Sequence, residues 1–341
     1  MVKSTNQPVV IIPNLNGGAE LLEAVESLEL QTLKPYIIVV DNASRPGSVT
    51  AIAQWADGAL QRLGEPRVHD KHANDYAAAW QMPGSGQIQI VSMTDNLGFA
   101  GGNNVGVRMA LRDPLCKYIL LLNNDTVADP QALAALRTKL DNTPEVAVCG
   151  ATLIYHDEST ICQGAAGTIN LLTVKTDHIA RGTAISELPE EADVEPRMDY
   201  VLGAAMFARA SVFARTGGLS EDYFLYFEEL DLSRRLLPEE KLGWAKLARV
   251  YHKVGSSIGT GSKSRPSDMS IYYDHRSKAL FYLNFHKALL PFLFANLLKG
   301  ILAYLRRGDI AACKAILAAG RDAFFKSPGV RPVFKPRPKT P

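Results

Sequence analysis

The sequence predicts an α/β protein in which helices cover both faces of a mostly parallel, doubly wound sheet, followed by a C-terminal helical extension. Three observations support this fold class. Short, nearly continuous apolar runs alternate with helical segments through the first 150 residues, as expected of strands buried on both faces of a parallel sheet. Several of these runs end abruptly on asparagine or aspartate. After Asp268 the chain becomes helical.

The expected elements follow one another in a regular order. Strands are predicted at 9–12, 36–40, 88–92, 118–122 and 146–149, and helices at 19–30, 102–111 and 130–140. Further along we expect a strand within 199–209, a helix from about residue 228, and helices at 276–305 and 310–325. Two stretches break the pattern. Residues 64–86 are predicted to form a surface excursion, and the irregular segment 155–198 is typical of a lid or an acceptor loop.

The composition excludes several classes of protein. With 341 residues, 47% of them hydrophobic, the chain is long enough for one large or two modest globular domains. The four cysteines are scattered without a C-x-x-C pair, so neither a zinc site nor a disulfide framework is indicated, and a reduced cytoplasmic setting is expected. The apolar run Val9–Ile12 is too short for a signal peptide, because Pro13 and Asn14 interrupt it.

The net charge of +2 hides a strong asymmetry between two parts of the chain. Residues 276–341 carry 13 basic and two acidic side chains, a balance of +11, whereas residues 1–275 carry 24 basic and 33 acidic side chains, a balance of −9. Basic, apolar segments suit an anionic membrane surface. Nucleic acid is the rival partner for a basic tail, but the apolar segment 289–305 argues against it.

For the apolar run 288–298, a surface-lying or core-closing helix is favoured over the alternative of a membrane span. It contains Pro291 and Asn296, and it is shorter than the roughly 20 apolar residues that a single span needs. We therefore expect peripheral association with the inner face of the cell membrane through residues 271–326, followed by a flexible basic tail at 327–341.

Two polar motifs near strand ends indicate a ligand site. The run 96–104, NLGFAGGNN, is a glycine-rich turn that lets the main chain approach a ligand, and Asn103 and Asn104 are expected on the first turn of the following helix, facing the cleft. The alternative is a tight connection between a strand and a helix. The segment Asn123-Asn124-Asp125 ends an apolar strand and offers the oxygen ligands that Mg²⁺ or Mn²⁺ prefers. A solvated turn is the competing interpretation.

Two further groups are ambiguous when taken alone. Asp41-Asn42 ends the second strand and either hydrogen-bonds a nucleotide or forms an Asx turn. Among Glu228, Glu229 and Asp231, one carboxylate is a candidate general base, although acids are also favoured at the start of a helix and Asp231 can pair with Arg235.

Taken together and in order, these motifs resemble the family 2 inverting glycosyltransferases of the GT-A fold, in the rhamnosyltransferase-like branch. The resemblance covers roughly residues 8–285. It is carried by the segments 12–17, 39–44, 96–104, 121–126, 203–206, 217–219 and 226–232, and by His252 with Gly255-Ser256-Ser257. It implies a glycosyltransferase domain at 1–270, with a nucleotide-sugar half at 1–150 and an acceptor half at 151–270.

The resemblance also implies roles for particular residues. The nucleotide would be held by Pro13, Asn14, Asp41 and Asn42, and the sugar diphosphate by Asn96, Gly98, Asn103 and Asn104. Asn123 and Asn124 are also expected among the cofactor-binding residues. Asp125 matches the last acid of the family's metal-binding D-x-D motif, and His252 matches a histidine that completes the metal shell. Glu229 matches the catalytic base. Glu228 and Asp231 stay open as alternatives to it.

The sequence departs from the family pattern at two positions. The D-x-D motif is Asn-Asn-Asp here, which implies weaker binding of the divalent cation. Glutamate replaces the family's aspartate at Glu229, which lengthens the base by one methylene. The Q-x-x-R-W motif of processive synthases is absent from the sequence, which indicates that one sugar is added per event.

The expected function is inverting, non-processive transfer of a sugar, for which rhamnose is the leading candidate, from a nucleotide diphosphate donor to a lipid-linked or saccharide acceptor in cell-surface polysaccharide synthesis. Two rivals remain. One is a nucleotidyltransferase on a related fold, which would need a phosphate-gripping basic loop near the N-terminus that this sequence lacks. The other is a degenerate scaffold that binds a sugar nucleotide without turning it over.

Overall fold

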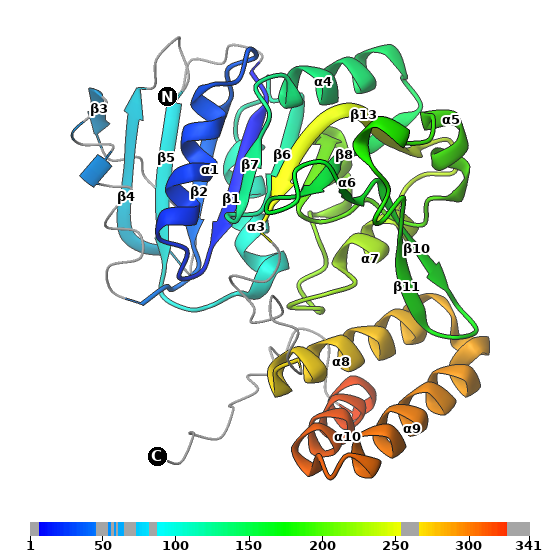
Figure 1. The fold of residues 1–341 in the computed structure, drawn as a ribbon. Coiled ribbons are helices and arrows are strands. Elements are labelled where there is room, and N and C mark those ends of the chain that lie inside the picture. The colour runs from blue at the N-terminus through cyan, green and yellow to red at the C-terminus, as the bar shows by residue number, and fades with distance from the viewer. Residues whose placement is uncertain are drawn as a thin grey trace.

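The computed structural model describes residues 7–45, 54–55, 58, 61–64, 73–81, 87–253 and 266–325. Its centre is an 11-stranded mixed sheet with the strand order β3-β4-β5-β2-β1-β6-β12-β8-β13-β7, with β9 paired to β8 (Figure 1). The helices α8 to α10 form a separate layer at one end of the molecule. The motif residues Gly255-Ser256-Ser257 and the basic tail 327–341 lie outside the described residues.

Four parallel strands form the N-terminal half of the sheet, as predicted. They are β5 (Gln87–Met93), β2 (Tyr36–Asp41), β1 (Val9–Asn14) and β6 (Tyr118–Leu122). The register pairs Asn14 with Asp41, so the polar residues that end β1 and β2 are neighbours. Alternate residues of β1 pack into two different cores: Val10 and Ile12 pack with α1 (Ala19–Glu29), and Ile11 with α3 (Gly98–Ala110). The two helices therefore cover opposite faces of the sheet.

The remaining strands make the sheet mixed. β12 (Ala205–Arg209) is antiparallel to both β6 and β8 (Val146–Tyr155), whereas β13 (Lys241–His252) runs parallel to β8. The short strands β7 (Thr126–Ala128) and β9 (Cys162–Gly164) add antiparallel pairs. The expected surface excursion 64–86 contains β4 (Ala73–Gln81), a strand that the sequence did not predict; it pairs antiparallel with β5 and with the edge strand β3 (Gln61–Gly64).

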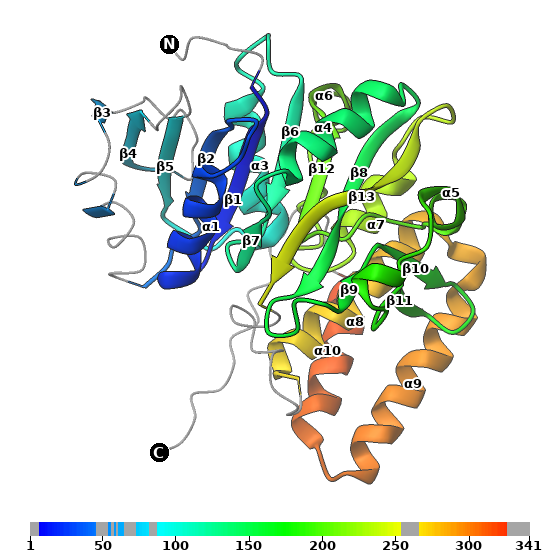
Figure 2. The same cartoon turned by 45° about the horizontal axis from the view of Figure 1, so that its top comes forward.

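Smaller elements connect these strands. The irregular stretch 155–198 contains the hairpin of β10 (Ala166–Asn170) and β11 (Lys175–Ile179), the helix α5 (Glu191–Val194), and the 3-10 turns η2 (Ile185–Glu187) and η3 (Glu195–Arg197). The hairpin reaches from the sheet towards α8 and α9 (Figure 2). The other helices are α4 (Ala132–Asn142), α6 (Ala210–Thr216) and α7 (Glu228–Arg234).

The C-terminal layer consists of α8 (Asp268–Phe285), the 3-10 turn η4 (Lys287–Leu289), α9 (Leu290–Arg306) and α10 (Ile310–Phe325). The predicted continuous helix 276–305 is therefore wrong, because the backbone leaves the helical region at His286 and Pro291 starts a new helix, where its missing N–H is tolerated. Among the described residues, one helix, Lys287–Arg306, is long and apolar enough to cross a membrane, and 11% of its most apolar window is buried.

Candidate active site

The carboxyl ends of β1, β2 and β6 are tied together by a chain of side-chain amides. Asn14 donates from Nδ2 to Asp41 Oδ1 at 3.0 Å, and Asn124 donates to Asn14 Oδ1 at 2.8 Å. All three side chains are buried, so these hydrogen bonds replace the water that polar groups need. Gly17 is required beside them, because a Cβ at this position would lie 2.1 Å from Asn124 Nδ2.

Asn42 connects the end of β2 to the glycine-rich turn. Its Oδ1 accepts from the Leu97 amide at 2.8 Å, while its Nδ2 donates to the Gly98 carbonyl at 2.9 Å and to Asn96 Oδ1 at 3.1 Å. Gly98 has φ +74°, and a Cβ there would lie 2.3 Å from the Phe224 carbonyl oxygen. The turn therefore needs glycine for its backbone conformation and for a close contact with a distant segment.

The helix after this turn begins earlier than expected, which changes the placement of two asparagines. Because α3 starts at Gly98, Asn103 and Asn104 lie beyond its first turn. Asn104 donates to the Leu219 carbonyl and accepts from the Leu219 amide, both at 2.8 Å. Its side chain thus anchors a loop, and the expectation that it faces a cleft was wrong. Asn103 donates to Phe99, and its buried Oδ1 has no hydrogen-bond partner within the described part of the chain.

Asp125 and His252 meet beyond the ends of β6 and β13. His252 Nε2 lies 3.2 Å from Asp125 Oδ1, and His252 Nδ1 lies 2.9 Å from Gln163 Oε1 on β9. An amide oxygen only accepts, so this contact places a proton on Nδ1 and leaves Nε2 facing the carboxylate. Two electron-rich groups this close need a second proton or a cation between them.

This arrangement fits a divalent cation that is shared with a ligand. Two ligands at about 2.1 Å from one ion and at right angles are about 3 Å apart, close to the observed separation. Nearby, Asn123 Oδ1 is buried and accepts no hydrogen bond from the described residues, so a second oxygen is available. Within the described ranges no group of three or more His, Cys, Asp or Glu side chains is arranged for a metal ion, so other ligands would have to complete the shell.

Glu228 and Glu229 begin α7 and form an adjacent pair of acidic side chains. Glu228 is 2% exposed; burial first, and then the charge of Glu229, raise its pKa well above the usual value. Glu229 is partly exposed. Burial raises its pKa to about 7, opposed by hydrogen bonds from backbone amides that include Gly203. A Cβ at Gly203 would lie 2.2 Å from Glu229 Oε1, so glycine is needed there to seat this carboxylate.

Asp231 is less suited to accept a proton from a ligand. It forms an ion pair with Arg235, whose guanidinium also donates to the carbonyls of Thr216 and Gly218 at 2.9 and 3.1 Å. Burial raises the pKa of Asp231 and Arg235 opposes the shift. The carboxylate is therefore part of a packing contact, which is the structural alternative considered from the sequence.

Strained backbone precedes the acidic pair. Phe224, Tyr226 and Phe227 all have φ between +64° and +72°, which is unfavourable for large side chains. The Phe224 carbonyl accepts from the Phe99 amide at 2.7 Å, and the Phe224 ring stacks on Tyr273 of α8 with centroids 4.6 Å apart. Contacts from the glycine-rich turn and from α8 hold this conformation.

The predicted residues therefore meet around one edge of the sheet. The amide of Asn123 donates to the carbonyl of Ala204 at 3.0 Å, and Ala204 directly follows the Gly203 that seats Glu229. This contact joins the candidate metal ligands to the acidic pair. Pro13 of β1 lies against α3, with its Cβ 3.5 Å from the position of a Cβ at Gly102.

Sequence reasoning missed one residue of this site. Gln163 orients His252, but it lies 89 positions away and in a stretch without a recognisable pattern. A single glutamine carries no spacing signal, so only the pairing of β9 with β8 and of β13 with β8 reveals the contact.

Comparison with known proteins agrees with this geometry. The family model for glycosyl transferase family 2 matches residues 9–184. The chain is 26% identical over 200 residues to a low-salt glycan biosynthesis hexosyltransferase of Haloferax volcanii, covering 57% of this chain and 59% of that relative. It spans about three fifths of that relative's length. It is also 25% identical over 294 residues to an N-acetylglucosaminyl-diphospho-decaprenol L-rhamnosyltransferase of Mycobacterium tuberculosis, covering 82% and 84% of the two chains.

A solved structure has the same fold. A mannosyltransferase from Pyrobaculum calidifontis, in complex with GDP-Man and Mn²⁺, superposes with a TM-score of 0.51 at 14% identity, covering 94% of this chain and 88% of that one. The predicted GT-A type of α/β fold with a C-terminal helical extension is thereby confirmed. The chain belongs to glycosyl transferase family 2 and is a glycosyltransferase.

Proposed function

We propose that this enzyme transfers one sugar, with inversion, from a nucleotide diphosphate donor to a lipid-linked saccharide, and that Glu229 is the general base. The observation that carries the proposal is the contact between the Glu229 carboxylate and the backbone of Gly203. Gly203 precedes Ala204, which hydrogen-bonds to Asn123 at the strand end that also leads to Asp125. A proton acceptor and a site for phosphate oxygens are then adjacent, as direct displacement at a sugar carbon requires.

The donor would bind along the edge made by β1, β2 and β6. Asp41, Asn14 and Asn42 would contact the nucleoside, and the turn at Asn96 and Gly98 would approach the diphosphate with its backbone. Most of these side chains already hydrogen-bond to one another, so they are ordered before the donor arrives. By the same argument Asn104 would act by fixing the loop at Leu219 and not by touching the donor.

In the transfer step the acceptor hydroxyl attacks the anomeric carbon from the face opposite the diphosphate. Its proton passes to the Glu229 carboxylate, the new C–O bond forms, and the bond to the diphosphate breaks, which inverts the configuration. The Gly203 amide holds the carboxylate in position, and a pKa of about 7 allows Glu229 both to accept a proton and to release it at neutral pH.

A divalent cation, Mg²⁺ or Mn²⁺, would be held by Asp125 and His252, with Asn123 as an additional oxygen ligand. When bound, it would neutralise negative charge on the departing nucleoside diphosphate. Gln163 would keep His252 Nε2 directed at the ion by holding the proton on Nδ1.

The acceptor and the location are proposed from the rhamnosyltransferase relative and from the C-terminal helices. The name of that relative specifies a saccharide on a diphospho-decaprenol lipid. Here α9 exposes large apolar side chains and is flanked by lysines and arginines, as expected of a helix on an anionic membrane surface. We therefore infer a peripheral position on the cytoplasmic face of the membrane, and rhamnose as the leading candidate sugar.

Donor binding and hydrolysis test the proposal. A panel of nucleotide sugars is screened by thermal shift with and without Mn²⁺, because a ligand that binds only the native state raises its stability. The matching donor should then release nucleoside diphosphate slowly in the presence of Mn²⁺. Asp125→Ala should abolish this release, whereas the control Asp157→Ala, whose side chain is 99% exposed, should not.

Other results in these assays would support one of the two alternative functions. Consumption of a nucleoside triphosphate with release of pyrophosphate would identify a nucleotidyltransferase. Tight donor binding without any turnover, in the presence of every acceptor tested, would identify a binding scaffold. Either result would overturn the proposed reaction.

A further inference from the structure

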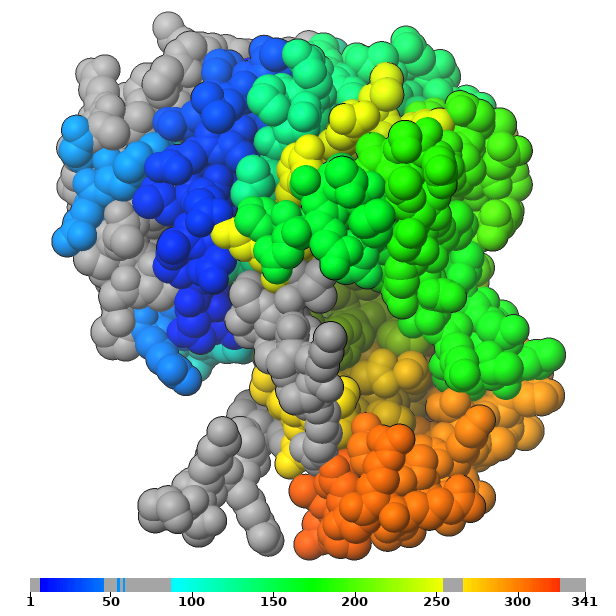
Figure 3. Space-filling model, in the orientation of Figure 1, coloured from blue at the N-terminus to red at the C-terminus, as the bar shows by residue number. Residues whose placement is uncertain are grey.

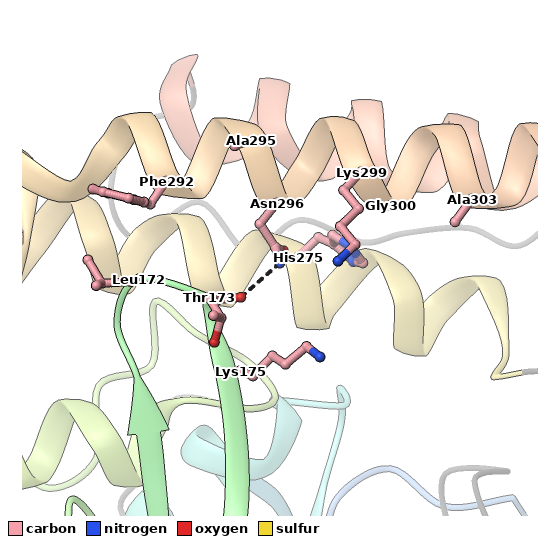
Figure 4. Close-up of a pocket in the computed structure, with 10 residues that line it drawn as sticks. All are labelled: Leu172, Thr173, Lys175, His275, Phe292, Ala295, Asn296, Lys299, Gly300 and Ala303. Carbon is pink, nitrogen blue, oxygen red and sulfur yellow. Dashed lines mark hydrogen bonds between the residues drawn. The ribbon is translucent and has the colours of Figure 1, made fainter.

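A groove lies between the tip of the β10–β11 hairpin and the helices α8 and α9, away from the residues of the candidate active site. Its volume is about 470 Å³. Figure 4 shows its lining: Leu172, Thr173 and Lys175 from the hairpin, His275 from α8, and Phe292, Ala295, Asn296, Lys299, Gly300 and Ala303 from α9. Figure 3 shows the surface hollowed between the sheet and the C-terminal helices.

The lining combines positive charge with apolar surface. Lys175 and Lys299 approach from opposite walls, and none of the described lining residues is acidic. The nearest acid on α8, Asp274, is already paired with Lys278 at 2.6 Å. The remaining walls are formed mainly by the apolar side chains of Leu172, Phe292 and Ala295. A ligand that fits this lining carries negative charge at one end and hydrocarbon at the other.

The groove is preformed. Asn296 Nδ2 donates to the Thr173 carbonyl at 3.1 Å and fixes the hairpin to α9. On the other side, Gly300 of α9 faces His275 of α8 at ordinary van der Waals distance, since a Cβ there would be 3.4 Å from His275 Nε2. The walls are thus held by contacts between α9, its neighbour α8 and a hairpin more than 100 residues earlier.

α9 carries a second, exposed apolar face on a different side from the groove. The groove residues Phe292, Asn296, Lys299 and Ala303 are spaced by three or four positions and share one side of the helix. A separate stripe with the same spacing is 42–57% exposed: Phe294, whose ring also stacks on Phe324 of α10, Leu298, Leu302 and Leu305. Such a stripe fits the acyl region of a bilayer better than water.

The hairpin also connects the groove to the candidate base. Thr176, next to Lys175, hydrogen-bonds to the Tyr200 side chain. Burial raises the pKa of Tyr200, and the negative charge of the nearby Glu229 is the second largest cause of that shift. Lys175 is therefore separated from Glu229 by only two intervening side chains, those of Thr176 and Tyr200. A phosphate near Lys175 would lie on the side of the hairpin that contacts the candidate base.

We propose that this groove binds the phosphate or diphosphate group of a long-chain isoprenoid lipid, with Lys175 and Lys299 on the phosphate oxygens and the apolar stripe of α9 in the bilayer. The occupant is a lipid and not free phosphate, because half of the groove lining is hydrocarbon and the same helix carries the exposed apolar stripe. This inference rests on the proposed function, since it assigns a place to the lipid part of the proposed acceptor.

Vesicle binding tests the inference. Phosphatidylcholine vesicles are prepared with undecaprenyl phosphate, with phosphatidylglycerol at equal charge, or with neither, and the bound fraction is measured by cosedimentation. The wild-type protein should prefer the undecaprenyl phosphate vesicles. Lys175→Ala combined with Lys299→Ala should weaken that binding by about tenfold or more, since each cation near an anionic surface contributes about fivefold.

A matched pair of variants controls for charge alone. Lys287→Ala combined with Lys314→Ala removes two exposed lysines of the same helical layer that do not line the groove, and it should leave the preference intact. Ala295→Trp fills the groove without changing charge and should reduce the preference as the first pair does. Thermal unfolding of every variant verifies that it is folded.

Two results would overturn the inference. One is equal binding to undecaprenyl phosphate and phosphatidylglycerol vesicles. The other is an equal loss in the two lysine pairs, which would indicate attraction of charge without a site. Donor binding is measured on the same preparations: if the donor binds but the lipid preference is missing, the groove assignment fails alone, and if no donor binds, the proposed function fails and the vesicle result still decides the groove.

Discussion

Glu229→Gln is the most direct test of the proposed mechanism. The glutamine has nearly the same shape, and its amide oxygen can still accept from the Gly203 amide that seats the wild-type carboxylate. It removes the charge and the capacity to take a proton. Donor binding depends on residues at the ends of β1, β2 and β6, so it should be unchanged. The substitution thereby separates proton transfer from binding.

The expected loss in rate follows from the value of a general base. Positioned proton transfer contributes about 10²–10⁴-fold, which corresponds to about 3–5 kcal/mol of transition-state stabilisation. We expect kcat for transfer to fall within this range while the thermal shift caused by the donor is retained. Glu229→Asp keeps a carboxylate one methylene further from the acceptor, and it should lose less.

The pH profile provides a second readout. Burial raises the pKa of Glu229 to about 7, so roughly a tenth of the enzyme holds the ionised base at pH 6 and roughly nine tenths at pH 8. The wild-type rate should therefore rise through neutrality and level off above it. The residual rate of Glu229→Gln should show no such step. A step of the same size in the variant would assign the titration to another group.

The stability of the folded protein should depend on pH in a direction set by Glu229. Between the ordinary pKa of 4.5 and the folded value of about 7, the folded protein binds the proton and the unfolded chain does not, so stability falls as pH rises through this window. The full effect is at most about 3 kcal/mol and is reduced by the partial exposure of the group. Glu229→Gln should therefore be more stable than wild type at pH 8, but not at pH 4.

The assay follows nucleoside diphosphate release and product formation with the matching donor and acceptor. Glu239→Gln is a suitable control, because this glutamate is exposed in the loop after α7. If Glu229→Gln retained more than about a tenth of wild-type kcat, the loss would be below the range for a general base, and the assignment would be refuted. A loss of donor binding in the same variant would also contradict the division of roles.

Three further predictions concern residues around the site. Gly17→Ala places a Cβ 2.1 Å from Asn124 Nδ2 and should destabilise the fold by about 1–3 kcal/mol, measured by urea unfolding, with weaker donor binding. Gln163→Ala frees His252 to change tautomer and should weaken Mn²⁺ affinity by about 10–100-fold in a titration with nucleoside diphosphate present; unchanged affinity would remove Gln163 from the site. Asn104→Ala leaves one buried backbone amide and one carbonyl unpaired and should destabilise the protein by about 2–4 kcal/mol while a correctly folded fraction keeps its metal affinity.

The parallel strands could be predicted from the sequence because their signal is local. β1, β2 and β6 are buried on both faces, so each is a continuous apolar run that ends on a polar residue. β13 gave no such signal, because exposed Lys241, Leu247 and Arg249 interrupt it and its register shifts between Ala245 and Arg249. Its partners β8 and β7 both lie far earlier in the sequence, and those pairings define it as a strand.

The site was predictable in its composition but not in its contacts. Motif residues at strand ends were identified because side chains at the carboxyl edge of a parallel sheet converge. The start of α3 was misplaced by four residues, because the side chain of Asn42 fixes Leu97 and Gly98 from 55 positions away. The choice among the three acids likewise depended on Gly203 and Arg235, which lie outside the motif that contains the acids.

The distribution of charge along the chain predicts how the molecule is oriented at an anionic membrane surface. Residues 1–275 carry a balance of −9 and residues 276–341 a balance of +11. Of the +11, residues 276–325, which form most of the C-terminal layer, contribute +6, with 8 basic and 2 acidic side chains. An anionic surface therefore repels the sheet and attracts the C-terminal layer, so the molecule should approach with α9 first. This orientation places the groove at Lys299 against the membrane and keeps the donor edge in solution, where a soluble nucleotide sugar arrives. Because the Debye length is about 8 Å at physiological ionic strength, the preference is short-ranged and should weaken as salt is raised, whereas insertion of the apolar stripe should not.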